Sequence, residues 1–167
     1  MIIRLLTVGD AEGYRALRLR ALREHPEAFL STYEAEVARP IEATSAKLAP
    51  ETGKFTLGAF DASGRLAGVA TLVRETNPKI AHKANVYAVY VAPEARGNRV
   101  GQSLLQALIA KARACDGVEQ LHLTVMASNK AAVRLYASVG FVAYGTEPRA
   151  MKIDGSYYDD QHMVLVL

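Results

Sequence analysis

The sequence predicts an α/β fold that forms a single domain over residues 1–167. The chain is long enough for one compact core, because half of its 167 residues are hydrophobic and 22% are charged. Segments with the helical spacing of apolar residues alternate with shorter segments typical of strands. No low-complexity linker and no internal repeat divides the chain, so we expect one unit rather than two.

The first third of the chain predicts a strand and two helices. A short apolar strand is expected over Ile2–Leu6. Asp10 stands where an N-cap precedes a helix, and this helix ends near His25. Its apolar positions recur at helical spacing, namely Tyr14, Leu17, Ala21 and Leu22. The stretch Glu27–Arg39 carries mixed signals, whereas Ile41–Leu48 predicts a second short helix.

The middle of the chain predicts a hairpin and a third strand. Phe55–Phe60 and Arg65–Arg74 have the composition of strands, and the turn Asp61–Gly64 joins them. Ala84–Val91 is rich in valine and tyrosine and predicts the next strand. This strand must stop before Pro93, because proline has no N–H for pairing within a sheet.

The last third predicts two helices that alternate with strands. Gly97–Gly101 leads into an amphipathic helix whose apolar face consists of Val100, Leu104, Leu105, Leu108, Ile109 and Ala112. Leu121–Val125 predicts a strand, and Asn129–Val139 predicts a helix that Gly140 closes. Two final strands are expected, at Phe141–Thr146 and Met163–Leu167.

Composition and charge exclude several classes of protein. The formal net charge of +3 is too small to indicate a nucleic-acid binder by itself. Cys115 is the only cysteine, so it can form no intrachain disulfide and no cysteine metal cluster, and a reducing compartment is expected. The apolar runs are far shorter than a bilayer span, and the first residues do not resemble a secretion signal. We therefore expect a cytoplasmic protein that binds no metal.

The run Arg96-Gly97-Asn98-Arg99-Val100-Gly101 is the first motif that predicts chemistry. It connects a strand to the start of an amphipathic helix, where free backbone N–H groups point at an anion. Two guanidinium groups add charge, two glycines permit close approach, and the helix dipole contributes roughly half a positive charge. Phosphate is the natural ligand, although the same run could be an ordinary solvated loop.

The second motif lies about thirty residues further on, in the run from Asn129 to Tyr136 that is followed by Gly140-Phe141. With these two motifs in this order, the chain resembles the GCN5-related N-acetyltransferase superfamily. The resemblance extends from about Lys54 to the C-terminus, and the predicted N-terminal strand and helix also fit. It implies a mixed, mostly antiparallel sheet of about six or seven strands that splays open between two central strands. About four helices flank this sheet, and acetyl coenzyme A occupies the opening.

The resemblance also implies how the chain binds acetyl-CoA. The strand edge that pairs with the pantetheine arm would be the backbone of Val89, Tyr90 and Val91. The pyrophosphate would be held by the backbone N–H groups of Arg96, Gly97, Asn98, Arg99, Val100 and Gly101. The family usually has glycine where this chain has Arg99, which places the affinity for the coenzyme in question. Gly101 keeps the second glycine position.

Two residues of the second motif match functional positions of the family. Asn129 matches an asparagine beside the pantetheine arm, and it is also a good N-cap. Tyr136 matches the tyrosine that protonates the departing thiolate, although a tyrosine on an apolar helix can equally be a packed core residue. A thiol with a pKa near 8.5 and a phenol with a pKa near 10 are close enough for this proton transfer.

The sequence does not assign the base that deprotonates the acceptor amine. At the places where many relatives have a glutamate, this chain has Val86, beside Asn85, and Thr124. The candidate replacements are Glu34, Glu36 and His82. Water relays through Tyr87 or Tyr90 are a further route, and so is binding of the small fraction of the amine that is already unprotonated. Glu34 and Glu36 follow the first helix, in a segment that overlies the acceptor site in the family, and could equally be solvated surface charges.

The sequence predicts fewer residues of the acceptor pocket than of the coenzyme site. Glu34, Glu36 and Tyr87 are the candidate substrate-binding residues. The run Tyr157-Tyr158-Asp159-Asp160 follows a turn at Asp154-Gly155 and could be either a hairpin tip or part of a pocket for a cationic amine.

The predicted function is direct transfer of an acetyl group from acetyl-CoA to a primary amine within a ternary complex, because no nucleophile for an acetyl-enzyme is evident. The acceptor, a small molecule or a peptide, is not identified. The alternative is a non-catalytic acyl-CoA-binding sensor or scaffold with the same fold. Nucleic acid and membrane partners are not expected, and the apolar strand Met163–Leu167 could extend a sheet across a homodimer.

Overall fold

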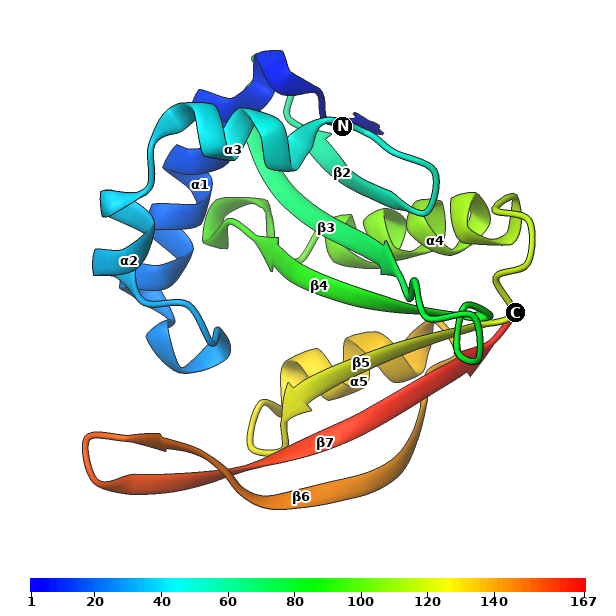
Figure 1. The fold of residues 1–167 in the computed structure, drawn as a ribbon. Coiled ribbons are helices and arrows are strands. Elements are labelled where there is room, and N and C mark those ends of the chain that lie inside the picture. The colour runs from blue at the N-terminus through cyan, green and yellow to red at the C-terminus, as the bar shows by residue number, and fades with distance from the viewer.

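The computed structural model describes all 167 residues, Met1–Leu167, and contains one seven-stranded sheet (Figure 1). The strand order is β1-β2-β3-β4-β5-β7-β6, and every neighbouring pair is antiparallel except β4 and β5. The predicted mixed, mostly antiparallel sheet is confirmed. The strands are β1 (Ile2–Leu5), β2 (Lys54–Phe60), β3 (Leu66–Arg74), β4 (Lys83–Val91), β5 (Gln120–Met126), β6 (Val142–Ile153) and β7 (Ser156–Val166).

Five α-helices accompany the sheet, one more than the expected four. They are α1 (Ala11–Glu24), α2 (Tyr33–Ala38), α3 (Ile41–Leu48), α4 (Val100–Arg113) and α5 (Lys130–Ser138). The additional helix is α2, in the stretch whose signals were mixed. Its N-cap is Thr32, whose hydroxyl accepts a hydrogen bond from the N–H of Ala35 at 3.2 Å. No helix is long and apolar enough to cross a membrane.

Asp10 occupies the N-cap position of α1 but does not cap it through its side chain. Its carboxylate accepts from the backbone N–H of Thr7 at 2.8 Å and forms an ion pair with Arg4 at 2.7 Å. These contacts, the hydrogen bond with Arg4 first, lower the pKa of Asp10 to about 2. The predicted N-cap position of Asp10 is therefore confirmed, but a 3-10 turn at Val8–Asp10 comes first and uses the carboxylate of Asp10 instead.

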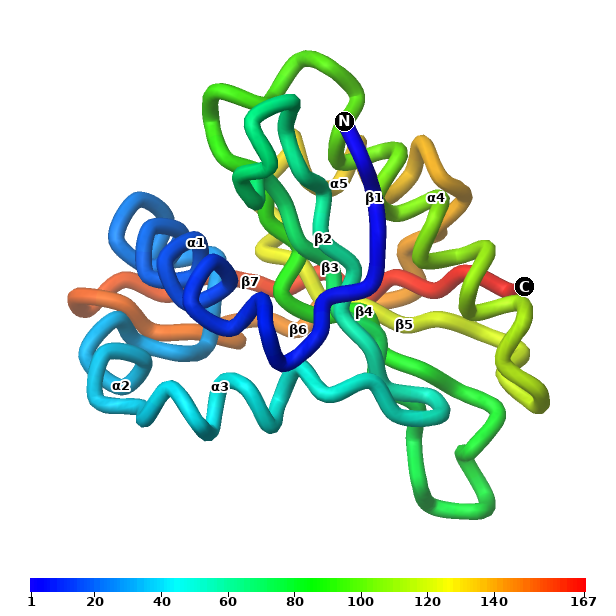
Figure 2. Tube along the Cα trace, turned by 90° about the horizontal axis from the view of Figure 1, so that it is seen from above, coloured from blue at the N-terminus to red at the C-terminus, as the bar shows by residue number.

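Helices cover both faces of the sheet (Figure 2). The apolar face of α4 packs on β2, β3 and β4 as predicted, and its six apolar residues are all buried. On the opposite face, α1 packs through Tyr14, Leu17 and Ala21 against Val69 and Tyr90. The two faces therefore have separate hydrophobic cores, which lie on either side of β3 and β4.

The sheet opens between β4 and β5. Only Lys83–Asn85 of β4 pairs with Gln120–His122 of β5, and the two strands diverge beyond these residues (Figure 1). A bulge accompanies this divergence, because one residue of β3, Ala70 between Val69 and Thr71, opposes two residues of β4, Ala88 and Val89. Ala88 takes a positive φ of 52° at this bulge. The predicted splay between two central strands is confirmed.

The C-terminal hairpin is longer than predicted. The turn at Asp154-Gly155 lies where it was expected, but β6 continues to Ile153 and β7 begins at Ser156. β7 lies between β5 and β6, and Met163 pairs with Leu123 on one side and Ala143 on the other. The strand proposed to extend a sheet into a second subunit is thus already paired, and the open edges belong to β1 and β6.

Candidate active site

A cavity of about 720 Å³ lies where β4 and β5 diverge. One wall is the edge of β4 at Val89–Val91, which has no partner in β5. The other walls are the loop before α4, the first turn of α4, and the end of β5 with α5. Of the predicted coenzyme-binding residues, the cavity brings together Val89, Tyr90, Val91, Arg96, Gly97, Arg99, Val100, Gly101 and Asn129. Asn98 does not join them and lines a separate surface cavity beside Arg20 and Glu94.

Two residues of the loop before α4 have a left-handed backbone conformation, and both line the cavity. Gly97 has a φ of 81°, and Arg99 has a φ of 56° directly before the first residue of α4. In this left-handed region of φ, steric strain destabilises a residue that has a side chain by about 1–2 kcal/mol, whereas glycine is not strained. This explains why glycine is the usual residue at the position of Arg99. The free N–H groups of the first turn of α4 then face the cavity at Val100, Gly101 and Gln102.

Gly101 permits close packing of α4 on α5. A Cβ atom added to Gly101 would lie 3.0 Å from Cδ2 of Leu135 and 3.6 Å from Cγ2 of Val91. The contact with Leu135 is tighter than usual and would require that side chain or α5 to shift by a few tenths of an ångström, whereas the contact with Val91 is of ordinary length. Gly101 thus lets the start of α4 lie close to α5 beside the cavity.

Asn129 and Tyr136 line the cavity from α5. The side chain of Asn129 caps α5 by accepting from the N–H of Ala132 at 3.1 Å, so its capping role is confirmed. Tyr136 is buried, and its ring meets Phe141 edge to face at a centroid distance of 6.1 Å. Burial raises the pKa of Tyr136 to about 12, so the phenol remains protonated at neutral pH.

The segment that follows α1 also lines the cavity, and sequence reasoning did not find it. His25, Glu27, Ala28 and Phe29 form this part of the wall. Nη2 of Arg96 lies 3.2 Å from Nε2 of His25, and its Nε donates to the carbonyl of Val91 at 2.9 Å. No local motif marks these residues, because their role comes from the packing of α1 beside β4.

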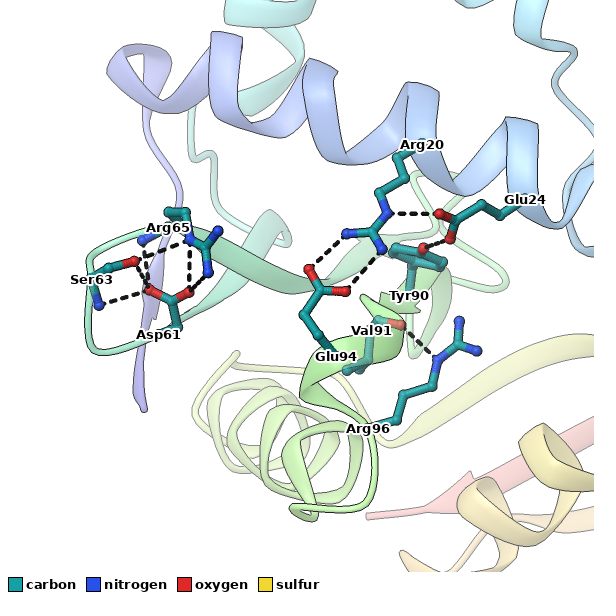
Figure 3. A network of polar contacts seen from close by, with 9 residues as sticks. All are labelled: Arg20, Glu24, Asp61, Ser63, Arg65, Tyr90, Val91, Glu94 and Arg96. Atoms are coloured by element: carbon teal, nitrogen blue, oxygen red, sulfur yellow. Dashed lines mark hydrogen bonds and ion pairs between the residues drawn. The ribbon is translucent and has the colours of Figure 1, made fainter.

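A polar network joins α1 to β4 and to the turn at Pro93–Ala95 that follows it (Figure 3). Arg20 donates two hydrogen bonds to Glu94, at 2.7 and 2.9 Å, and a third to Glu24 at 2.8 Å. Glu24 in turn accepts from the hydroxyl of Tyr90 at 2.9 Å. The hydrogen bond with Arg20 lowers the pKa of Glu94 to about 2, while burial raises the pKa of Tyr90 to about 12. These exposed pairs contribute little stability but fix the orientation of α1.

Beside the cavity, β4, β5, β7 and β6 present a polar face on the side of the sheet opposite α4. Alternation along the strands directs Tyr87, Thr124 and His162 to this polar face, because Leu123 and Met163 face the other core. Tyr87 is 54% exposed and Tyr144 59% exposed. Met126 lies two residues after Thr124 and lines the cavity, so the polar face and the cavity meet at the end of β5.

The structure separates the predicted base candidates. Glu36 is buried beside Arg39, whereas its neighbour Glu34 is exposed. His82 lies next to the closed end of the β4–β5 pair, where its carbonyl accepts from the N–H of Glu119, and it is not in the cavity wall. The hydroxyl of Tyr90 is held by Glu24, as described above.

Three polar side chains on the polar face, Thr124, His162 and Glu147, lie in a row from β5 across β7 to β6. Sequence reasoning did not anticipate these contacts. Oγ1 of Thr124 lies 3.2 Å from Nδ1 of His162, its register partner on β7. Nε2 of His162 lies 3.4 Å from a carboxylate oxygen of Glu147 on β6. Thr124 is the residue that stands where many relatives have a glutamate. Only strand pairing reveals that His162 lies beside it, since 38 residues separate the two in the chain.

The residues of the run Tyr157–Asp160 in β7 have different surroundings and do not line one pocket together. The carboxylate of Asp159 accepts from the N–H of Arg149 at 2.8 Å, and Arg149 also lies over the ring of Tyr157 at 4.9 Å. These residues stabilise the hairpin. Asp160, in contrast, lies on the polar face with His162, and burial raises the pKa of Asp160.

Comparison with known proteins agrees with this geometry. The sequence model of the acetyltransferase (GNAT) family matches residues 16–141. The chain belongs to this family. It also superimposes on an acetyltransferase of the GNAT family from Streptococcus pneumoniae with a TM-score of 0.86 and 26% identity over 99% of both chains. The structure of yncA from Salmonella typhimurium, solved with its cofactor acetyl-CoA, gives a TM-score of 0.80 and 24% identity over 100% of this chain and 94% of that one.

Two groups of named acetyltransferases are similar in sequence. The mycothiol acetyltransferase of Salinispora tropica is 31% identical over 81% of this chain and 42% of its own length. The L-methionine sulfoximine/L-methionine sulfone acetyltransferase of Pseudomonas aeruginosa is 33% identical over 66% of this chain and 64% of its own length. The chain thus spans about two fifths of the first relative and less than two thirds of the second.

The left-handed conformation of Arg99 predicts that Arg99→Gly stabilises the protein. Relief of about 1–2 kcal/mol of strain is partly offset by the greater freedom of glycine in the unfolded chain, about 0.5–1 kcal/mol. We expect a net gain of roughly 0.5–1 kcal/mol, which raises the Tm by roughly 2 °C in a thermal melt. Arg99→Ala is the control, because it removes the guanidinium and retains the strain. A glycine variant no more stable than the alanine variant would contradict the assignment of strain.

Proposed function

We propose that this chain is an acetyl-CoA-dependent N-acetyltransferase that transfers the acetyl group to a primary amine by direct attack in a ternary complex. The observation that carries the proposal is the cavity between β4 and β5, where a free strand edge, the first turn of α4 and the phenol of Tyr136 face one space. Membership of the GNAT family, whose members use acetyl-CoA, supports it.

The residues of the cavity fit this cosubstrate. Amides of the first turn of α4 and the charges of Arg96 and Arg99 suit a pyrophosphate. The free edge of β4 at Val89–Val91 suits an extended chain with amide groups, which can pair with it as an added strand. Acetyl-CoA supplies the acetyl group as a thioester when it is bound. The bulge at Ala88 helps to keep this edge apart from β5.

Tyr136 supplies a proton to the leaving sulfur in this proposal. Its pKa of about 12 keeps the phenol protonated, as a general acid must be before it acts. A thiolate in the same buried place also has a raised pKa, because burial disfavours every anion, so the two acids stay comparable. The half-buried Cys115 is outside the cavity, with Sγ directed at the carbonyl of Lys111. No cysteine is therefore available for an acetyl-enzyme.

His162 is the base that the geometry favours, acting through Thr124. When Nε2–H of His162 faces Glu147, the lone pair of Nδ1 accepts the hydroxyl proton of Thr124. The Thr124 oxygen can then take a proton from the acceptor amine while its own proton moves to His162. Glu147 stabilises the imidazolium that forms, which is the role of the carboxylate in a His–carboxylate pair.

Ligand binding and thiol release test the proposed function together. We expect acetyl-CoA to raise the Tm of the protein, because a ligand that binds only the folded state stabilises it, and we expect DNA to leave the Tm unchanged. A panel of primary amines with a thiol reagent then measures turnover. Stabilisation without thiol release from any amine would favour a coenzyme-binding sensor instead. No stabilisation at millimolar acetyl-CoA would overturn both functions.

Tyr136→Phe is expected to lower kcat by about 100-fold and to leave the Kd of acetyl-CoA within about twofold of the original value. Phenylalanine retains the ring that packs on Phe141 and removes only the acidic proton. Because the pKa of Tyr136 is raised to about 12, the phenol is protonated throughout the neutral and mildly alkaline range. The kcat of the unmodified protein should therefore show no loss from Tyr136 ionisation up to about pH 10. An unchanged kcat in the variant would remove Tyr136 from the mechanism.

His162→Gln is expected to lower kcat by about 100-fold near neutral pH. The charged or titratable neighbours of His162 are Glu147 and Tyr144 on β6 and Asp160 on its own strand. If His162 accepts the amine proton, the defect should shrink as the pH approaches the pKa of the acceptor, where the free amine needs no base. His122→Gln is the matched control on the same face and should leave this pH profile unchanged. A defect of equal size at every pH would indicate a structural role.

A further inference from the structure

A row of three side chains crosses the cavity wall where the segment after α1 meets the loop before α4. Glu27, His25 and Arg96 all line the cavity. Nδ1 of His25 lies 3.7 Å from a carboxylate oxygen of Glu27, and Nε2 of the same ring lies 3.2 Å from Nη2 of Arg96. In the chain, 71 residues separate His25 from Arg96, so this contact links two distant segments of the cavity wall.

The contact with Arg96 determines which nitrogen of His25 carries the proton. A guanidinium has N–H donors and no acceptor, so Nε2 of His25 must accept this hydrogen bond. The imidazole is then neutral, and its one N–H is at Nδ1, on the side of Glu27. The carboxylate on this side favours that tautomer, because it attracts the N–H group. In this row, Glu27 therefore orients His25, and His25 accepts from Arg96.

Two residues of β4 also hold Arg96. Nε of Arg96 donates to the carbonyl of Val91 at 2.9 Å (Figure 3), and Cζ of Arg96 lies over the ring of Tyr90 at 5.7 Å. Together with the contact to His25, these interactions hold the guanidinium at two of its three nitrogen atoms. They use two of the five N–H groups of the guanidinium, so three remain without a partner in the protein. Arg96 thus keeps free donors in the cavity wall at a fixed position.

Arg99, the other arginine of the cavity wall, is not held in this way. No hydrogen bond and no ion pair within the protein fixes its guanidinium. A long side chain loses conformational entropy when a ligand fixes it, whereas a side chain that the protein already holds loses less. Of the two arginines in the cavity wall, Arg96 is therefore the one that is preorganised to bind an anion.

We propose that His25 is a positioning residue for the cosubstrate: it accepts from Nη2 of Arg96 and thereby holds the free N–H groups of this guanidinium ready for the pyrophosphate of acetyl-CoA. The inference rests on the proposed function, because it assigns a further role in binding acetyl-CoA at that site. Glu27 acts one step further away, since it keeps the lone pair of Nε2 on the side of Arg96. Without the acceptor on His25, Arg96 would have to be ordered by the coenzyme itself, and acetyl-CoA would bind more weakly.

Two substitutions of His25 test this role. His25→Phe keeps a planar ring beside Tyr90 and removes the acceptor, whereas His25→Gln retains an oxygen that can accept from Arg96. In calorimetry with acetyl-CoA, we expect His25→Phe to raise the Kd about fivefold and His25→Gln to keep the Kd within about twofold of the original value. In thiol release, His25→Phe should raise the KM of acetyl-CoA in the same proportion and keep kcat within about twofold. His82→Phe, outside the cavity wall, is the matched control and should change neither the Kd nor the KM.

A double-substitution cycle shows whether His25 acts through Arg96. Arg96→Met removes the guanidinium and should raise the Kd of acetyl-CoA about tenfold or more. In the Arg96→Met background, His25→Phe should raise the Kd no further, because the side chain that His25 positions is gone. If His25 only supported the packing of the segment after α1, the two effects would multiply instead. The Tm of His25→Phe without ligand should stay within about 2 °C of the original value, because the side chain of His25 is partly exposed.

The outcomes separate this inference from the proposed function. An unchanged Kd in His25→Phe or Arg96→Met, an equal loss in His25→Gln, or effects that multiply in the double variant would overturn the positioning role and leave the acetyltransferase function standing. The expected pattern of Kd values without thiol release from any amine would support the positioning role and overturn the catalytic function. No binding of acetyl-CoA to the original protein at millimolar concentration would overturn both.

Discussion

The structure depends on the early end of the parallel pairing between β4 and β5. Three residues of each strand pair, and the bulge at Ala88 then accompanies the turn of β4 away from its neighbour. Backbone groups left without a partner in the middle of a sheet are unfavourable unless another chain or ligand pairs with them. An extended polar ligand that paired with Val89–Val91 would therefore stabilise this edge of β4. The first turn of α4 and one face of α5 enclose the same space. The cavity therefore results from the early end of the hydrogen-bonded pairing between β4 and β5.

Several unfavourable local features lie around this opening. Arg99 and Ala88 have positive φ values, and Tyr136 buries a phenol. Each of these features lowers the stability of the folded state, and each lies on or beside the cavity. The core beneath α4 is built differently, since α4 contributes a continuous apolar face to it. Strain of this kind at a site is typical of residues held in place for binding.

The sequence predicted those features that are local or repeat with a regular period. The apolar face of α4, the turn at Asp61–Gly64, the cap at Asn129 and the strand end before Pro93 all follow from residues close together in the chain. Pairings across long distances could not be predicted in this way. The contact between Thr124 and His162 needs the β5–β7 register, and the contact between Arg96 and His25 needs the packing of α1 beside β4. The N-cap position of Asp10 was predicted, but the ion pair of its carboxylate with Arg4 was not, because that contact depends on how the preceding strand lies beside the turn.

The opening also explains how the proposed acid and base would reach one reaction from different faces of the sheet. Tyr136 belongs to the core beneath α4 and α5, whereas Thr124 and His162 belong to the opposite face of the sheet. An intact sheet would keep these faces apart, and in the proposed reaction the gap between β4 and β5 would let a thioester approached from one face meet an amine approached from the other. Burial keeps the phenol of Tyr136 neutral on its side, as an acid must be before it gives its proton to the sulfur. On the other side a carboxylate oxygen of Glu147 lies 3.4 Å from Nε2 of His162, where it would pair with the imidazolium that forms only once the proton of the amine has been passed on.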